Sequence, residues 1–425
     1  MRTKAFRMKK PFKAASMATA GAAILSTLSA FAGDGSKPYT LSAGVRGFYD
    51  DNIFTANNKV DVDGDKKPDR RKFDSFGFEI TPSVRFNVPL EGSTLTAGYT
   101  YGLRYYESRP GSKDDQFHLA DVAFSHAFNP RYKLSVSDQF AAAQEPDQMV
   151  AFSGSGTLPQ VVRAEGSNIR NSAGADLTVQ IVPLWSAVVG YRNNYYNYKN
   201  KGFAEALDRM ENLPSLGLRY QLAPKTVLSG NYQYGDVNYR NTKSDFRDNR
   251  SHYVFAGVDH SFTSQLVGSL RAGAQFVDWY HAPAGARADA VNPFIDANVT
   301  YSYATGSNVQ IGFRHARNAT DLEAASAVLD QQSSLAYGSI NHQITGKLRG
   351  SVVAQYQNSE FIGASKAVLL NGQKEDYISL GLTLNYRINN YLSAEAAYYY
   401  DQLASDVNFR DYSRNRVFVG IRATY

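Results

Sequence analysis

The sequence predicts an all-β protein: a single antiparallel, up-and-down transmembrane β-barrel of about 18 strands. Three observations predict it. Apolar and polar residues alternate over runs of about ten residues, which exceeds the usual strand of soluble proteins and suits tilted membrane strands. Short turns alternate with longer polar loops. The chain holds 29 Tyr and 33 Gly, and its mean hydropathy is only −0.39, as expected when the two faces of each strand cancel.

The N-terminus predicts an export signal. Residues 1–13 carry six basic residues and no acidic one, and an Ala-rich apolar run follows over 14–31. Ala30-Phe31-Ala32 then fits the small-x-small cleavage rule. We therefore expect a signal peptide over 1–32, cut after Ala32, and a barrel over 33–425. A retained transmembrane helix is the alternative, which the modest hydropathy of the run disfavours.

The net charge belongs to this signal. The whole chain has 45 Lys and Arg against 39 Asp and Glu. Removing the six basic residues of 1–13 leaves 39 of each sign, so we expect no nucleic-acid partner. The chain has no Cys, which excludes a disulfide framework.

The strands follow in order from the alternation, which is clearest over 76–88, 95–104 and 378–388. Short turns are expected near Leu90, Pro130, Pro183, Pro224, Ser264, Gly306, Gly346 and Asn390. Longer loops are expected at 55–72, 108–114, 145–167, 199–209, 240–250, 281–291, 317–332, 358–375 and 403–412. These connections join eighteen strands, with short periplasmic turns and longer extracellular loops. A soluble β-sandwich, the alternative, predicts shorter strands and loops of similar length at both ends.

Two further patterns support a membrane barrel. Val417, Val419, Ile421 and Tyr425 alternate to a terminal aromatic residue, which resembles the C-terminal strand that the barrel-assembly machinery reads. An ordinary last strand is the alternative. His126, His260 and His342 each precede a short turn on the apolar face, and we interpret them as part of an interfacial girdle rather than as ligands.

The sequence shows no enzyme motif. The seven His are scattered, and the chain lacks a Cys nucleophile, an HExxH helix and a phosphate-binding loop. A triad assembled from several strands remains the alternative. We therefore expect no catalytic residues, no enzyme activity and no cofactor.

The polar face of the strands is expected to line the lumen, because an Arg facing lipid at the midplane would cost about 2–4 kcal/mol. The predicted pore-lining residues are Arg46, Asp50, Glu79, Arg85, Arg104, Asp121, Asp176, Arg192, Arg219, Asp259, Arg271, Asp296, Arg314, Arg349, Arg387, Glu395 and Arg422. Either they form a salt-bridged wall or they tune a polar, mildly cationic conduit that also suits hydroxyl-rich sugars.

Two loops raise separate hypotheses. The segment 145–167 is less charged than a solvated loop, so it either folds into the lumen and narrows it or packs over the rim. Asp61, Asp63, Asp65 and Asp69 resemble an acidic calcium loop, although the neighbouring Lys and Arg repel a cation and favour a solvated loop.

The stretch Phe48-Tyr49-Asp50-Asp51-Asn52-Ile53-Phe54 places two adjacent carboxylates in an aromatic frame. Adjacent strand residues point to opposite faces, so the two cannot act as a catalytic pair. Asp50 is expected to face the lumen and pair with a base, and Asp51 to lie above the apolar band at the outer rim.

Residues 45–54, "VRGFYDDNIF", resemble the opening strand of the putative β-barrel porin 2 family. Many members of that family are associated with exopolysaccharide synthesis and export. The resemblance implies a passive outer-membrane channel for exopolysaccharide or oligosaccharide. The implied partners are outer-membrane lipid, the assembly machinery and periplasmic export components. A general diffusion porin is one alternative, and a non-conducting barrel for adhesion or polymer anchoring is another.

Overall fold

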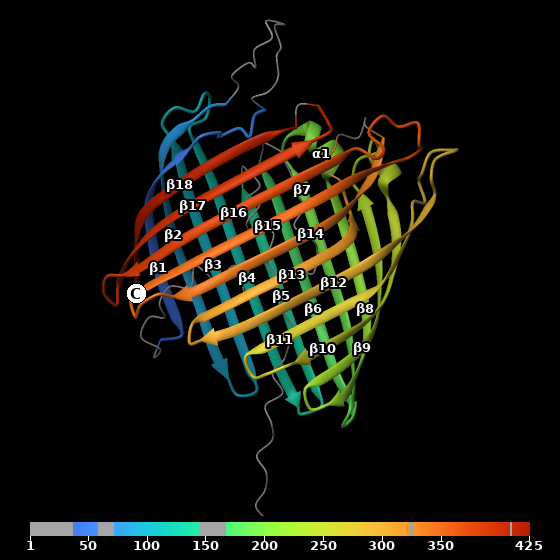
Figure 1. The fold of residues 1–425 in the computed structure, drawn as a ribbon, viewed down its shortest axis with the longest axis horizontal. Helices are drawn as coiled ribbons and strands as arrows, with labels where there is room; N and C mark the ends of the chain where they lie inside the picture. The colour runs from blue at the N-terminus through green and yellow to red at the C-terminus, as the bar shows by residue number, and fades with distance from the viewer. Residues whose placement is uncertain (1–36, 58–71, 144–166, 321, 323–326, 409) are drawn as a thin grey trace, which may run out of the picture.

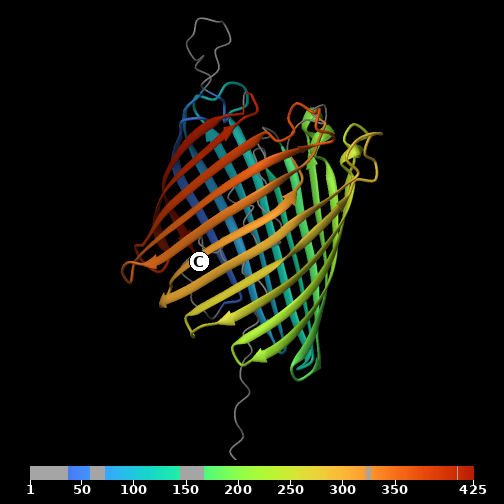
Figure 2. The ribbon, with the colours of Figure 1, turned by 45° about the vertical axis from the view of Figure 1, so that its right-hand side comes forward.

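Eighteen antiparallel strands close into one barrel (Figures 1 and 2), as expected. The computed structural model describes residues 37–57, 72–143, 167–320, 322, 327–408 and 410–425. Each strand pairs with its neighbours in sequence, and β1 pairs with β18 from Ser42–Thr424 to Asp50–Arg416, which closes the sheet without an open edge. Within the described residues, no helix is long and apolar enough to cross a membrane.

The strands are β1 Tyr39–Asp50, β2 Ser75–Leu90, β3 Ser93–Tyr106, β4 Asp114–Asn129, β5 Tyr132–Ala143, β6 Asn168–Val182, β7 Trp185–Tyr198, β8 Arg209–Ala223, β9 Thr226–Tyr239, β10 Asn249–Ser261, β11 Leu266–Asp278, β12 Asp289–Ala304, β13 Ser307–Asn318, β14 Val328–Gln343, β15 Leu348–Gly363, β16 Lys374–Arg387, β17 Leu392–Ser405 and β18 Tyr412–Thr424.

The short turns lie at one end of the barrel, here the turn end, and the longer connections at the other, here the loop end (Figure 2). All eight turns fall where the sequence predicts them. Several loops are shorter than predicted: β15 continues to Gly363 although a loop was expected from 358, and β14 begins at Val328 rather than after 332. The apolar alternation stops at these strand ends, but backbone pairing continues, as Val328 paired with Gly363 shows.

The connection after β7 contains a short helix, α1 (Lys201–Leu207), which the sequence did not predict (Figure 1). Asn200 caps it, because its side chain accepts a hydrogen bond from the backbone N–H of Gly202 at 3.0 Å. The connection after β9 contains a single 3-10 turn, η3 (Asp245–Arg247).

The two faces of each strand differ as the alternation predicts. On β18, Val419 is 62% exposed, whereas its neighbour Phe418 is 3% exposed. Val417 and Ile421 share the exposed face, and Arg414 and Arg416 share the inner one. The outer surface is therefore apolar, and the charged side chains of the strands gather inside.

Inward-facing aromatic rings cover glycines on neighbouring strands. A Cβ built on Gly102 of β3 would overlap the ring of Phe117 on β4. The absence of a side chain at Gly102 thus lets the ring lie against the backbone of the next strand.

The histidines named above lie on the outer face near the turn end, and each contacts a hydroxyl on another strand. The contacts are His126 to Ser93 (2.6 Å), His260 to Thr226 (2.9 Å) and His342 to Tyr303 (2.8 Å). Nearer the loop end, His118 and His252 make the same kind of contact, at 2.8 Å, with Tyr99 and Tyr232. Polar rings of this kind suit the two boundaries of an apolar band.

Candidate functional site

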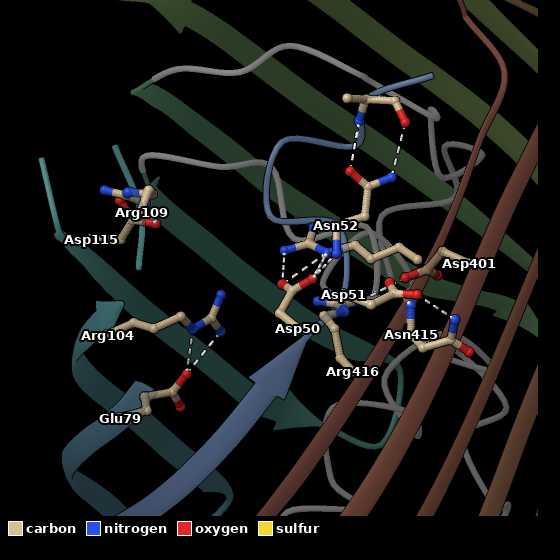
Figure 3. Close-up of polar contacts among 12 residues, drawn as sticks. Asp50, Asp51, Asn52, Glu79, Arg104, Arg109, Asp115, Asp401, Asn415 and Arg416 are labelled. Atoms are coloured by element: carbon tan, nitrogen blue, oxygen red, sulfur yellow. Dashed lines mark hydrogen bonds and ion pairs between the residues drawn. The ribbon is translucent and has the colours of Figure 1, made fainter. Parts of the chain in front are cut away.

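Asp50 and Asp51 lie on opposite faces of the first strand, as expected (Figure 3). Asp50 is 2% exposed, and both of its oxygens accept a hydrogen bond from Arg414 Nε at 3.0 Å. Asp51 instead accepts hydrogen bonds from the backbone N–H (2.6 Å) and the side chain (2.8 Å) of Asn415. The sheet separates the two carboxylates, which rules them out as an acid–base pair.

Asn52 holds the chain where it leaves β1. Its side chain donates to the carbonyls of Ala56 and Ser413, both at 3.0 Å, and accepts from the backbone N–H of Ala56 at 2.9 Å. Asp50 in turn accepts from the backbone N–H of Asn52 at 3.0 Å. The acidic stretch therefore fixes the end of the first strand against the last one, and its role is structural.

Glu79 is the centre of a buried cluster below Asp50 (Figure 3). Arg46 lies 2.6 Å and Arg104 lies 2.8 Å from its two oxygens, and Glu79 is fully buried. Arg46 also stacks over the ring of Phe418, with 4.3 Å between its Cζ and the ring centroid. Two guanidinium groups share one carboxylate here, and each oxygen has a charged donor, as a buried ion pair requires.

Most of the other predicted pore-lining residues also form ion pairs on the inner face. The pairs are Arg85–Asp121 (3.0 Å), Arg271–Asp259 (3.3 Å), Arg314–Asp296 (3.7 Å) and Arg422–Glu395 (3.6 Å). Arg387 instead donates to the carbonyl of Gly346 at 3.0 Å. Asp176, Arg192, Arg219 and Arg349 form no ion pair with the described part of the chain. That these residues line a conducting pore stays a prediction.

Several inner charges escaped the sequence analysis. Arg414 pairs with Asp50, and Arg416 lies 2.7 Å from Asp401, which also accepts hydrogen bonds from Tyr377 (3.0 Å) and Ser379 (2.7 Å). Arg209 pairs with Glu211 at 2.8 Å. Each lies an even number of residues from Arg422, Glu395 or Arg219 on the same strand. Alternation therefore places them on the same inner face and could have found them. They were missed because they lie in or next to the segments 199–209 and 403–412, which the sequence analysis took as loops.

The connections at the loop end pack against one another across the mouth. Arg247 of η3 is fully buried and donates to the carbonyl of Val328 on β14 (2.8 Å) and of Ala206 in α1 (3.1 Å). β9 and β14 are five steps apart in the sheet, so this contact spans the opening rather than following the wall. Trp279, 1% exposed, packs beside it with Val277, Leu329 and Ala364.

Two carboxylates accept hydrogen bonds from backbone N–H groups where β7 and β9 end and these connections begin. Asp208 accepts from the N–H of Tyr198 at 2.7 Å, and Asp248 from the N–H of Tyr239 at 2.6 Å. Burial raises the pKa of both carboxyl groups, and the hydrogen bonds oppose that rise. His281 Nδ1 lies 3.1 Å from Asp248, which links the connection after β11 to the one after β9.

Three predictions fall on residues outside the described part of the chain: the signal peptide over 1–32, nearly all of the segment 145–167, and the acidic loop of Asp61, Asp63, Asp65 and Asp69. In the described part, no group of three or more His, Asp or Glu is placed to hold a metal ion. At the C-terminus, Tyr425 is exposed, and Lys37 Nζ lies 3.6 Å from its ring centroid. Reading of this strand by the assembly machinery stays a prediction.

The family model described as "Putative beta-barrel porin 2" matches residues 192–425. The chain belongs to this family. The match covers β8 to β18 together with part of β7, whereas the resemblance noted above lies at 45–54, outside it. Family membership and the closed sheet together identify the chain as a porin-like outer-membrane β-barrel. Membership of this family also indicates a channel rather than an enzyme.

Similar solved structures include three porin-like barrels. OccAB4 of Acinetobacter baumannii has 15% identity and a TM-score of 0.43, over 92% of this chain and 99% of that one. A BenF-like porin of Pseudomonas fluorescens Pf-5 has 10% identity and a TM-score of 0.46, over 91% and 99%. OpdK of Pseudomonas aeruginosa, solved with vanillate, has 10% identity and a TM-score of 0.44, over 91% and 99%. No curated protein sequence matches the chain.

Proposed function

We propose that this porin-like barrel is a passive channel for an exopolysaccharide or oligosaccharide across the outer membrane. The observation that carries the proposal is the division of every strand into an apolar outer face and a polar, charged inner face. Barrels of about 16–18 strands enclose an aqueous lumen unless a segment plugs it. A polar lining lets hydrated solutes pass without losing all their hydrogen bonds, so no energy source is needed.

The saccharide preference rests on the inner face of β14 and β15. This face carries uncharged hydrogen-bonding side chains, namely Gln331, Ser333, Gln355, Gln357 and Ser359. Gln355 Oε1 is buried and accepts no hydrogen bond from the described residues. Amide and hydroxyl groups match the hydroxyls of a sugar, and the family resemblance points the same way.

Conductance of the purified protein in a planar bilayer tests the proposal. We expect a steady current that needs no ligand or voltage step to open, and block of that current by a long oligosaccharide but not by a monosaccharide. Gln355→Leu with Gln357→Leu should weaken the block, whereas Ala354→Leu on the outer face of the same strand should leave it unchanged.

Other outcomes would contradict the proposal. A folded barrel that carries no current would make the protein a scaffold rather than a channel. Equal passage of salts and small sugars without any block by oligosaccharides would make it a general diffusion porin.

A further inference from the structure

Three arginines on neighbouring strands of the inner face differ from most charged residues of the wall, because they form no ion pair with the described residues. Arg170 on β6, Arg192 on β7 and Arg219 on β8 have no acidic partner within 4.0 Å in the described part of the chain. Nε and Nη2 of Arg170 are buried and lack any hydrogen-bond partner there. On β1 to β3, by contrast, Arg46, Arg85 and Arg104 all pair with carboxylates. We call Arg170, Arg192 and Arg219 the arginine strip.

The strip runs lengthwise along the barrel wall. Arg170 stands opposite Tyr196 of β7, and Arg219 stands opposite Ser186 of the same strand. Measured on β7, the three positions are therefore 196, 192 and 186. At about 3.3 Å per residue, the guanidinium-bearing positions follow one another at intervals of about 13 Å and about 20 Å. A solute that moves along this wall would meet one positive charge after another.

Two acids lie beside the strip, and one of them is already paired: Glu211 on β8 stands opposite Asn194 of β7 and forms an ion pair with Arg209 at 2.8 Å. Asp176 on β6 stands opposite Gly190, and a Cβ built on Gly190 would lie 2.6 Å from its Oδ1. Asp176 forms no ion pair with the described residues. Because Glu211 is balanced by Arg209, Asp176 alone faces the three guanidinium groups, which leaves the strip with an excess of positive charge.

We propose that the arginine strip is an anion-binding track and that the solute of this channel carries carboxylate or phosphate groups. Guanidinium groups bind both kinds of oxyanion through paired N–H donors and stay charged at every physiological pH. This inference rests on the proposed channel function and makes it more specific: the saccharide is acidic rather than neutral.

Reversal potentials in a planar bilayer under a KCl gradient test the proposal. We expect the wild-type channel to prefer Cl⁻ over K⁺. Arg192→Gln, and then Arg192→Gln with Arg219→Gln, should lower the Cl⁻/K⁺ permeability ratio stepwise at low salt. Coulomb's law in water at about 10 Å gives a factor of at least about two for each charge removed, and the effect should shrink as salt rises.

Two controls separate this effect from a general loss of charge. Arg131→Gln removes one positive charge from an exposed turn outside the lumen and should leave the ratio unchanged. Arg85→Gln with Asp121→Asn removes an ion pair between β2 and β4 without altering the net charge, and should do the same.

A binding measurement keeps this inference separate from the channel proposal. Oligogalacturonate, but not a neutral maltooligosaccharide, should release heat on titration into detergent-solubilised protein, and a variant with Gln at all three strip positions should lose that heat. If the barrel conducts but neither its ion selectivity nor its oligogalacturonate binding depends on the strip, the anion-track proposal is wrong and the channel proposal is unaffected. A non-conducting barrel with strip-dependent binding would overturn the channel and retain the track. Absence of both current and binding would overturn both.

Discussion

At the scale of single residues, burial decides what a charge does in this barrel. Asp50 and Asp51 have the same chemistry and adjacent positions, yet Asp50 is 2% exposed and the side chain of Asp51 is 23% exposed. Asp50 faces Arg414 in a dry site, and Asp51 lies in the polar rim beside Asn415 and Lys72. The sequence predicted the two faces, because alternation leaves no other choice.

Asp50→Asn should destabilise the barrel strongly. The change leaves Arg414 buried without an opposite charge, and breaking a buried pair in this way costs about 3–5 kcal/mol. Urea unfolding in lipid vesicles, followed by the gel shift of the folded form, would measure the loss. Asp51→Asn is the matched control, since the amide can still accept from Asn415 and the site is wetter. Equal effects of the two changes would contradict this account.

A pH effect is expected at Asp248, which lies in the loop between η3 and β10. Burial raises the pKa of its carboxyl group above the ordinary value of 3.8, and Asp245 adds to that rise, whereas the Tyr239 N–H and His281 oppose it. A raised pKa means that the ionised form is the costly one. The penalty is absent below the ordinary value and grows as the pH rises through the raised one.

Asp248→Asn should therefore remove the pH dependence of this loop. The amide oxygen still accepts from the Tyr239 N–H but never ionises. Limited proteolysis of the outer loops between pH 4 and pH 7 would show wild-type cleavage increasing with pH and the variant staying level. His281→Gln removes the imidazole and therefore measures how much it contributes to the pH dependence of cleavage. A wild-type profile that persists in the Asn variant would assign the effect to another group.

At the scale of strands and loops, backbone pairing extends beyond the alternation. The predicted turns are correct because a two-residue or four-residue connection leaves both apolar patterns intact on either side. The predicted loops are too long because Gln331, Ser333, Asn358 and Ser359 break the pattern while remaining paired. The helix α1 was missed because seven residues are too few to show a helical period.

Gly102→Ala should disturb the pairing of β3 with β4. The added methyl group would overlap the ring of Phe117, and overpacking of this kind costs about 1–3 kcal/mol. Gly230→Ala on β9 is the matched control, since nothing lies within 4 Å of its added Cβ. Thermal unfolding followed by circular dichroism should show a lower midpoint for the first variant only. A similar shift in both would point to strand propensity instead.

At the scale of the whole molecule, contacts across the barrel matter as much as contacts along the sheet. Arg247 joins η3 and α1 to β14, and the backbone N–H of Arg287, after β11, donates to the carbonyl of Ala364, after β15, at 2.7 Å. Neither relation follows from sequence neighbours. Both arise because closure of the sheet brings remote strands to face each other.

Arg247→Ala should therefore loosen the mouth without weakening the barrel. The side chain's bonds to Val328 and Ala206 would be lost, so the connections after β7 and β9 would separate from β14. We expect faster proteolysis of these loops and altered conductance, with an unchanged unfolding midpoint. Arg240→Ala is the control, because among the described residues that exposed side chain bonds only to Tyr195 on the outer face. A large drop in the unfolding midpoint would mean that Arg247 supports the strands themselves.

The sequence by itself determined the strand number and the turn positions. These follow from a period of two, which local sequence expresses completely. Only the tertiary structure decided which charges neutralise one another: Glu79 takes both Arg46 and Arg104, while Arg170, Arg192 and Arg219 are left without an acid in the described chain. The reason is geometric. Pairing within a few ångströms depends on register, tilt and closure, and alternation specifies none of the three.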